Sequence, residues 1–402
     1  MDESSNSLCM CFGEQLDEES EDRRSRRVYS SIGSKVINES PEVKISNTLL
    51  KEQNYYESDV FAGTLNGRDV AIRVINKEFT SEAIQESEIL SKLEHHENII
   101  KFHFKFNDFN HTYVITEYYK TSLESYVQMS EEDKDLSAKE MCLQLTRAVD
   151  FLHQQKLLYL NLNPENVHIV GSRRVQKAKL TNFSNRSDIA ILDGFKPPEL
   201  NTQTKEIKEY PTDIYMLGCL FFYIITNGLK LPNLKQKNQQ KNIFAKINSY
   251  QAENNRPDVV LCFDITEQML WFKKNDRALI ETILEHPFFW TTEKLLNYII
   301  EVAVRIEKRD KIFYKKMEKN SKNIVGNDWT TGLDDIYEDI SNKRVYNVSS
   351  VVDLVRVLRN QIAHTNSSRV AETMGDSKED LMHYWLEKFP RLIPHLYFVM
   401  NA

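Results

Sequence analysis

The sequence predicts an α+β protein in which a strand-rich lobe, a mainly helical lobe and an all-helical tail follow one another along the chain. Three observations predict this order. Segments rich in β-branched and aromatic residues, separated by turn residues, occupy the region from about residue 43 to residue 117. After Ser122 the apolar residues recur at helical spacing. From residue 291 onward no strand-like alternation remains, and strands followed by helices are typical of the α+β class.

The first 42 residues are predicted to form a disordered arm. They are rich in Ser, Glu and Arg, and a mostly acidic run at 17–22 precedes Arg23, Arg24, Arg26 and Arg27. Such a segment has too little apolar surface to offset the conformational entropy that it would lose on ordering. The arginine cluster leaves two interpretations open, a basic contact patch and a solvated linker.

Residues 43–290 are predicted to form one domain that contains both lobes. Its strands are expected at 59–65, 69–75, 99–106 and 112–117, and Asn66-Gly67 is a typical hairpin turn. Its clearest helices are expected at 80–93, 138–154 and 212–226.

Residues 291–402 are predicted to form a separate, all-helical domain. The expected helices are at 294–309, 312–317, 333–340, about 348–364 and 384–400.

The composition excludes several classes of protein. The net charge of −7 argues against a general nucleic-acid binder, yet the charge is uneven. Residues 291–402 carry 17 basic and 16 acidic side chains, whereas the preceding 290 residues carry 35 and 43. The tail is therefore the part where a phosphate backbone would not meet net repulsion.

The cysteines and apolar segments indicate where the protein resides. The five cysteines form no C-x-x-C pair and no zinc pattern, and an odd, sparse count suits a reducing compartment. The longest uncharged apolar run, 214–226, is shorter than the roughly 20 residues that span a bilayer. We therefore expect a cytoplasmic protein with no membrane contact and no bound metal.

A series of short motifs in residues 43–290 resembles a protein kinase. The motifs stand in the family's order: Val70–Arg73 for V-A-I-K, Glu86 for the helix glutamate, Tyr159–Asn166 for H-R-D-L-K-P-x-N, Thr181–Ser184 at D-F-G, Pro197–Glu199 for A-P-E, and Asp213, Gly218 and Arg277 for three structural residues. The resemblance implies a two-lobed protein-kinase-like fold.

The residues that transfer phosphate in that family are replaced. Phosphoryl transfer needs one carboxylate near the accepting hydroxyl and another that holds Mg²⁺. Asn161 and Asn182 stand at those positions, Arg73 replaces the strand lysine, and Asn166 alone is retained as a metal ligand.

The glycine-rich loop is also lost, because Gln53, Tyr55 and Ser58 align with its three glycines. We expect no kinase activity. Binding of ATP or ADP without transfer remains open beside the favoured interpretation, an empty structural pocket.

The predicted helix at about 348–364 has two unlike faces. One carries the apolar residues Val351, Leu354, Val355, Leu358 and Ile362, with Arg359 at its border. The opposite face carries Asp353, Arg356, Asn360 and His364. By periodicity alone this is an amphipathic helix with a solvated polar face.

The tail resembles the kinase-extension nuclease family, which includes the inositol-requiring sensor of the unfolded protein response and ribonuclease L. The matching residues are Asp353–Val355 for D-L-L, Arg359, Asn360 and His364 for R-N-x-x-x-H, Tyr346 for an active-site tyrosine, Trp329 for a tryptophan of the ribonuclease L branch, and Phe389–Leu392 and Tyr397 for the closing motif. The resemblance implies an all-α kinase-extension nuclease domain.

The chemistry of RNA cleavage assigns these residues their expected roles. Because RNA supplies its own 2′-hydroxyl nucleophile, the enzyme needs a base, an acid and phosphate-binding donors, and no metal cofactor. His364 is the expected general acid, and Tyr346 is the base or the orienting group. Because an unperturbed tyrosine is a poor base, it would need a nearby cation such as Arg359.

The remaining polar residues are expected to hold the substrate or its contacts. Arg359 would also stabilise the phosphate charge, and Asn360 would bind phosphate or ribose. Asp353, Arg356 and Trp329 are supporting residues, with Asp353 anchoring an arginine and Trp329 either a core anchor or a base-stacking platform.

Three hypotheses follow. The first is a metal-independent endoribonuclease that forms a homodimer through its kinase-like lobe, as the resemblance implies. The second is a silent pseudoenzyme that binds RNA or a related kinase–nuclease. The third is a switch controlled by nucleotide binding.

Overall fold

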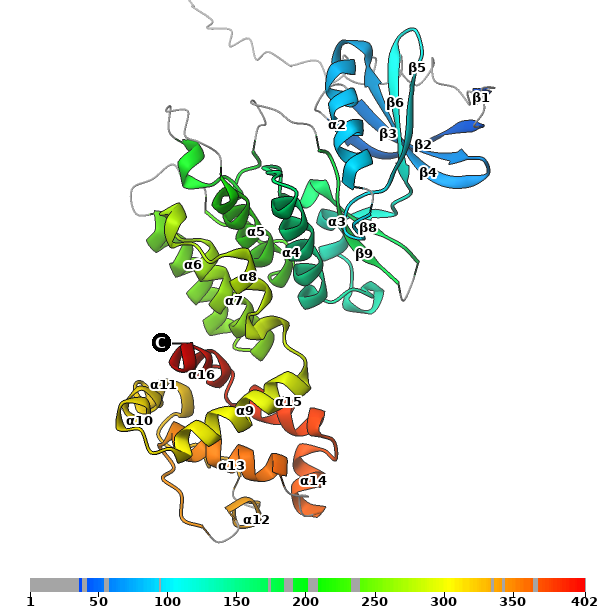
Figure 1. Cartoon of the computed structure of the whole chain (residues 1–402). Helices are drawn as coiled ribbons and strands as arrows, with labels where there is room; N and C mark the ends of the chain where they lie inside the picture. Colours follow the sequence, from blue (N-terminus) through cyan, green and yellow to red (C-terminus); the bar gives the residue numbers. More distant parts are fainter. Residues whose placement is uncertain are drawn as a thin grey trace, which may run out of the picture. The chain divides into compact units, whose positions relative to one another are not determined.

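The structure, a computed structural model, describes residues 36–37, 42–53, 58–93, 95–172, 175–183, 191–201, 209–232, 239–333, 336–341, 344–363 and 368–401. Its contacts divide the chain into two compact units. One unit comprises residues 1–88 and 101–118, and the other comprises residues 89–100 and 119–402. Figure 1 traces the elements of both units along the chain.

The first unit is built on a six-stranded antiparallel sheet. Its strands, in spatial order, are β1 (Val36–Ile37), β2 (Val43–Gln53), β3 (Ser58–Leu65), β4 (Arg68–Asn76), β6 (His111–Glu117) and β5 (Phe102–Asn107). The β3–β4 hairpin turns at Asn66 and Gly67, whose φ angles of 49° and 77° both lie in the left-handed region that this turn requires. Phe61, Ile72 and Ile115 lie in the core of the sheet.

Two sequence predictions for this region need correction. Val36 and Ile37 lie in the predicted disordered arm, yet they pair with Lys44 and Val43 as strand β1. The rest of the arm, 1–35 and 38–41, lies outside the described residues. The strand predicted at 99–106 begins at Phe102, because Ile99 instead forms a parallel bridge with Leu180 in the second unit.

Helix α2 (Thr80–Leu93) begins in the first unit and ends in the second, which also contains the helical lobe and the tail. The lobe's helices are α3 (Leu123–Val127), α4 (Ala138–Gln154), α5 (Tyr210–Ile225), α6 (Gln239–Glu253), α7 (Pro257–Met269) and α8 (Ile280–Leu284). Helix α5 is buried from Thr212 to Ile225 and packs against α4 and α7. The helices α2 and α4 match their predicted bounds.

A small sheet in this lobe was not anticipated. It consists of β7 (Thr121–Ser122), β8 (Val167–Val170) and β9 (Lys177–Leu180), all antiparallel. Strands of two to four residues are too short to show a periodic pattern. This sheet adjoins the loop that replaces the kinase catalytic loop.

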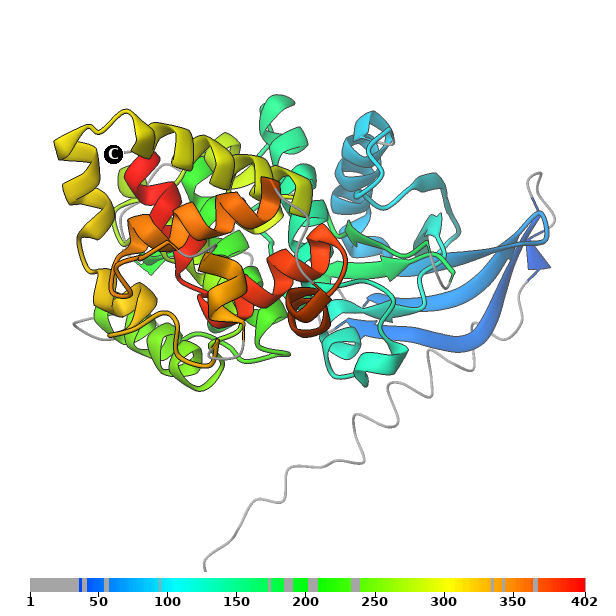
Figure 2. The same cartoon turned by 90° about the horizontal axis from the view of Figure 1, so that it is seen from below.

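The tail is all-helical in its described residues. Its helices are α9 (Thr292–Glu307), α10 (Lys311–Glu318), α11 (Ser321–Val325), α12 (Tyr337–Ser341), α13 (Val351–Ala363), α14 (Ser368–Met374), α15 (Lys378–Lys388) and α16 (Leu392–Asn401). Helices α9 and α13 lie side by side in both views (Figures 1 and 2). The tail also contacts the helical lobe, since α16 packs on α7 and on the turn at Pro287–Phe289.

The tail boundaries differ from the prediction in three places. The helix expected at 384–400 is two helices, α15 and α16, because Pro390 between them lacks the N–H that a continuous helix needs. The helix expected at 333–340 is shorter, Tyr337–Ser341, and helices α11 and α14 were not expected. The α+β class with a kinase-like fold and a helical extension is confirmed. In the part of the chain that the structure describes, no helix is long and apolar enough to cross a membrane.

Candidate functional site

Helix α13 carries most of the predicted site residues, and a carboxylate from α10 holds its first turn. Glu318 accepts hydrogen bonds from the Ser350 hydroxyl at 2.5 Å and from the backbone N–H groups of Val351 and Val352 at 3.2 and 3.1 Å. The first N–H groups of a helix have no partner within it, and negative charge there is stabilising. The helix therefore begins at Val351, three residues later than the expected Val348.

The segment that precedes α13 is fixed from two sides. The indole N–H of Trp329 donates to the carbonyl oxygen of Asn347 at 3.1 Å, and the carboxylate of Asp353 accepts from the Asn347 N–H at 2.8 Å. Trp329 is 1% exposed, so it has no face available for stacking on a base. Its ring meets that of Tyr346 edge-on at 6.3 Å between centroids. Trp329 is therefore a core anchor that supports the segment carrying Tyr346.

Tyr346 and Asn360 are in direct contact. The side-chain amide of Asn360 donates a hydrogen bond to the phenol oxygen of Tyr346 at 3.1 Å. Tyr346 is buried and Asn360 is half-buried. Because the phenol oxygen accepts this bond, its own proton remains available for a further hydrogen bond. The structure thus brings together two of the four predicted catalytic residues.

Both arginines of α13 are held by carboxylates. Arg356 donates to Asp353 at 2.6 Å, so Asp353 anchors an arginine as expected. Arg359 donates to Glu307 of helix α9 at 2.8 Å. Within the described ranges, no hydrogen bond or ion pair joins Arg359 to Tyr346, so the cation expected beside the phenol is not seen there.

Both guanidinium groups are nevertheless accessible to an anion such as phosphate. The guanidinium groups of Arg356 and Arg359 lie one helical turn apart, with side chains 39% and 34% exposed, so solvent reaches both. The Nε–H of Arg359 is buried and has no hydrogen-bond partner among the described residues. Planar guanidinium donors match phosphate oxygens in pairs. His364, the expected general acid, follows the last residue of α13 and lies outside the described residues.

Sequence reasoning did not identify Glu307, Glu318 and Asn347 as part of the site. Glu307 and Glu318 reach α13 from other helices, through contacts that depend on how the helices pack. Asn347 stands before α13, and its backbone N–H donates to Asp353 six residues away. Glu318 precedes Ser350 by 32 residues, and Glu307 precedes Arg359 by 52. No local motif spans such separations, so the sequence offered no signal for them.

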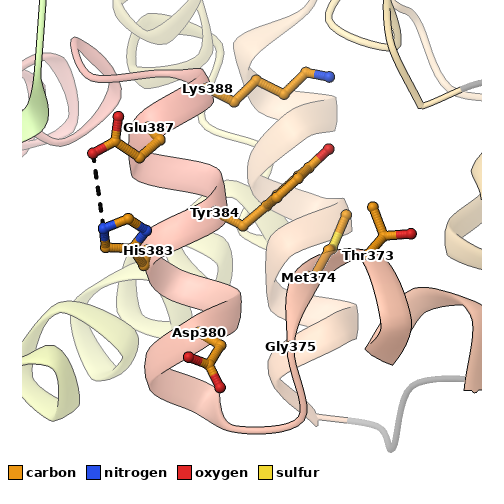
Figure 3. Close-up of a pocket in the computed structure, with 8 residues that line it drawn as sticks. All are labelled: Thr373, Met374, Gly375, Asp380, His383, Tyr384, Glu387 and Lys388. Atoms are coloured by element: carbon orange, nitrogen blue, oxygen red, sulfur yellow. Dashed lines mark ion pairs between the residues drawn. The ribbon is translucent and has the colours of Figure 1, made fainter.

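A groove of about 530 Å³ lies between the end of α14 and helix α15 (Figure 3). Thr373 and Met374 stand opposite Tyr384 in it, while His383 approaches Glu387 at 3.8 Å on α15. The Met374 sulfur accepts from the side-chain amide of Gln361 at 3.8 Å. Met374, in the wall of the groove, therefore packs against Gln361, the residue that follows Asn360 on α13.

The second unit keeps the backbone framework of a kinase catalytic loop. Asp213 accepts hydrogen bonds from the backbone N–H groups of Tyr159 and Leu160 at 2.9 and 2.7 Å. Arg277 forms a two-bonded ion pair with Glu199, at 2.8 and 2.7 Å. In the first unit, Arg73 forms an ion pair with Glu86. The predicted landmarks therefore occupy their structural positions.

The polar groups of that loop are satisfied by one another. The amide of Asn182 donates to the side-chain oxygen of Asn166 at 3.2 Å, and the amide of Asn166 donates to the carbonyl of Asn161 at 3.1 Å. Asn163 donates to both oxygens of Asn161 at 3.2 Å. A nucleotide with Mg²⁺ would need a carboxylate at 182 and a free oxygen on Asn166, and phosphoryl transfer would need a second carboxylate at 161. These residues do not fit that group.

Comparison with known proteins adds the family. Residues 57–289, more than half of the chain, match the protein kinase domain family. The chain belongs to the protein kinase family. Residues 295–402 match the family described as ribonuclease 2-5A. The resemblance to kinases that carry a nuclease extension is thereby confirmed.

Several curated relatives match most of the chain. The chain is 30% identical over 367 residues to the serine/threonine-protein kinase/endoribonuclease ire-1 of Caenorhabditis elegans, covering 84% of this chain and 37% of the relative. It is 27% identical over 390 residues to the sensor for unfolded proteins in the ER ire1 of Schizosaccharomyces pombe, covering 85% and 36%. The inactive serine/threonine-protein kinase/endoribonuclease IRE1-like protein of Arabidopsis thaliana is 26% identical over 424 residues, covering 88% and 74%. The chain therefore spans little more than a third of the first two relatives.

Proposed function

We propose that this chain is an endoribonuclease whose active site lies on α13 and the segment before it. The contact between the Asn360 amide and the Tyr346 phenol, with Arg356 and Arg359 on neighbouring turns of the same helix, carries the proposal. The donor–acceptor pair thus shares helix α13 with two cations, each of which is paired with a carboxylate. The tail's family match and the names of the relatives support the same activity.

The proposed reaction needs no metal because the substrate contributes the nucleophile. The 2′-hydroxyl attacks the adjacent phosphorus, and the bond from phosphorus to the 5′ oxygen breaks. The products are a 2′,3′-cyclic phosphate and a 5′-hydroxyl. Tyr346 contacts the attacking hydroxyl as its base or orienting group, and His364 gives a proton to the leaving oxygen. Asn360 holds Tyr346 and the phosphate or ribose by hydrogen bonds.

Arg359 reaches the phosphate by exchanging one partner for another. It is paired with Glu307, whose side chain is 55% exposed. An exposed ion pair contributes about 0–1 kcal/mol, so a substrate phosphate displaces the carboxylate at little cost. The phosphate then takes paired donors from the guanidinium and receives charge stabilisation in the transition state.

The kinase-like domain serves in this proposal as a platform without phosphotransfer. Neutral amides stand at 161 and 182, so neither accepts a proton near neutral pH nor offsets a metal charge. Contacts at Asp213 and Arg277 keep its own framework intact. In this proposal the domain holds two copies of the chain together as a homodimer in the cytoplasm, as the resemblance to kinase–nucleases implies. A related kinase–nuclease is the alternative partner.

A silent pseudoenzyme that binds RNA or a related kinase–nuclease is the second candidate function. The Arabidopsis relative that is named inactive favours this candidate, because the chain covers 74% of that protein. This candidate predicts RNA binding without product formation.

The test uses stem-loop RNAs in EDTA, with the oligomeric state of the protein verified beforehand. The proposal predicts cleavage of the all-ribose RNA and no cleavage when the nucleotide before the cut is 2′-deoxy. Mass spectrometry of the products should show the cyclic phosphate. Intact RNA bound by a verified dimer would favour the silent pseudoenzyme, and equal cleavage of the 2′-deoxy RNA would refute the mechanism.

A further inference from the structure

An aromatic pair lies in the helical lobe close to the amide cluster of Asn161, Asn163, Asn166 and Asn182. The ring of Tyr119 stacks on the imidazole of His168, with 3.7 Å between centroids and 15° between planes. Tyr119 is 6% exposed and His168 is 2% exposed, so solvent scarcely reaches either ring. Both residues belong to the second unit, as does the amide cluster.

The position of His168 follows from the strand that carries it. His168 lies in β8, and Asn166 ends the 3-10 turn that precedes this strand. Asn166 continues the pairing with β9, because its carbonyl oxygen accepts from the Thr181 N–H at 2.9 Å, next to the Val167–Leu180 pair. Side chains two apart along such a paired backbone point to the same face. At about 3.3 Å per residue, His168 lies about 6.6 Å along that face from Asn166. Asn166 occupies the position of the asparagine that binds the metal of a nucleotide in kinases. A nucleotide whose phosphates were held at Asn166 would extend its ring system along this same face.

The stack leaves no space for a third ring. A flat base between two aromatic rings needs a contact of about 3.5–4.0 Å on each side, so the rings must stand about 7 Å apart. The rings of Tyr119 and His168 are in direct contact at 3.7 Å. Strand β7 follows Tyr119 and pairs with β8 through Thr121–Ile169 and Ser122–His168. This pairing holds the two rings on adjoining backbone.

We infer that the stacked rings of Tyr119 and His168 fill the space where a nucleotide base would bind, and that the kinase-like domain is closed to purine nucleotides. The chain's own tyrosine and histidine take the place of the base, and its own amides take the place of the metal and phosphates. The domain's role as a platform is therefore independent of nucleotide. This inference does not rest on the nuclease activity, since it concerns binding to a different part of the chain.

The experiment opens the space and measures binding by titration calorimetry on the full chain. Adenosine is the main probe, because it carries the base without the phosphates that the amides no longer serve, and ADP with Mg²⁺ is the second probe. The variants are His168→Ala and, independently, Tyr119→Ala. The matched control is His96→Ala, because His96 also stacks on an aromatic ring, that of Phe151 at 4.7 Å, in the same unit.

The wild type and His96→Ala should show no saturable binding of either probe up to about 1 mM. His168→Ala or Tyr119→Ala should bind adenosine with a Kd at least about tenfold below that limit. Circular dichroism establishes which variants are folded. Binding of either probe by the wild type would overturn the inference, as would the failure of both opened variants, once shown to be folded, to bind adenosine. Equal adenosine binding by His96→Ala would also overturn the inference, because the loss of any aromatic stack would then be enough to create binding.

Discussion

The replacement of Tyr346 by phenylalanine separates a catalytic hydroxyl from a structural one. The change removes one oxygen and keeps the ring that packs edge-on against Trp329. The lost contact is a single neutral hydrogen bond from Asn360 at 3.1 Å. Such a bond contributes about 0.5–1.5 kcal/mol, so the free energy of unfolding should fall by about 1 kcal/mol.

The same replacement should reduce cleavage far more than it reduces stability. A positioned proton-transfer group contributes about 10²–10⁴-fold to a rate, so single-turnover cleavage at saturating protein should slow by that factor. Stability is measured by urea unfolding and cleavage by gel analysis of end-labelled RNA. Tyr337→Phe is the matched control, because Tyr337 also packs against Trp329, at 6.0 Å between centroids. The control should change neither quantity appreciably.

Two results would refute the reasoning for Tyr346. A folded Tyr346→Phe protein that cleaves RNA at the wild-type rate would show that its hydroxyl takes no part in the reaction. An equal loss of cleavage in Tyr337→Phe would show that packing around Trp329, rather than the Tyr346 hydroxyl, governs the rate.

Three further predictions test neighbouring contacts. Glu307→Gln removes the carboxylate that pairs with Arg359 and frees the guanidinium for phosphate. The KM for RNA should fall about two- to fivefold with kcat unchanged, because an exposed ion pair of this kind contributes about 0.5–1 kcal/mol. A lower kcat would instead assign Glu307 a positioning role. Asn182→Asp removes the amide that donates to Asn166 and should lower the free energy of unfolding by about 1–3 kcal/mol. Calorimetry that shows no loss of stability would contradict the amide contacts described above. Burial raises the pKa of the Glu267 carboxyl from its usual 4.5 to about 7. The folded state therefore binds this proton more tightly than the unfolded state does. The free energy of unfolding should fall as the pH rises from about 4.5 through 7. Glu267→Gln should therefore raise the melting temperature at pH 8 relative to the wild type but not at pH 4, and an equal shift at both pH values would refute the assignment.

The sequence predicted those parts of the fold that rest on local patterns. Helices α2 and α4 were placed at their observed bounds because apolar periodicity and turn residues mark them. The kinase-like framework was predictable because motif residues such as Asp213 and Arg277 act through fixed backbone contacts. Pro390 shows the limit of periodicity, since the apolar pattern continued across a position where the helix cannot.

The candidate site was predictable in its residue types but not in its pairings. The motif identified Tyr346 and Asn360, and the structure added their contact. The pairing of Arg359 with Glu307 depends on how α9 packs against α13, which no local pattern encodes. The Tyr119–His168 stack was missed for the same reason, because its rings meet across a two-stranded pairing of very short strands.

The central claim, metal-independent RNA cleavage by the tail, is tested most directly by one comparison. Wild-type protein and His364→Ala are incubated with the same stem-loop RNA in EDTA, at concentrations where both are shown to have the same oligomeric state. The account predicts that the wild type yields fragments ending in a 2′,3′-cyclic phosphate and that His364→Ala slows cleavage by about 10²-fold or more. Cleavage that is undiminished in His364→Ala, or RNA left intact by a verified wild-type dimer, would contradict it.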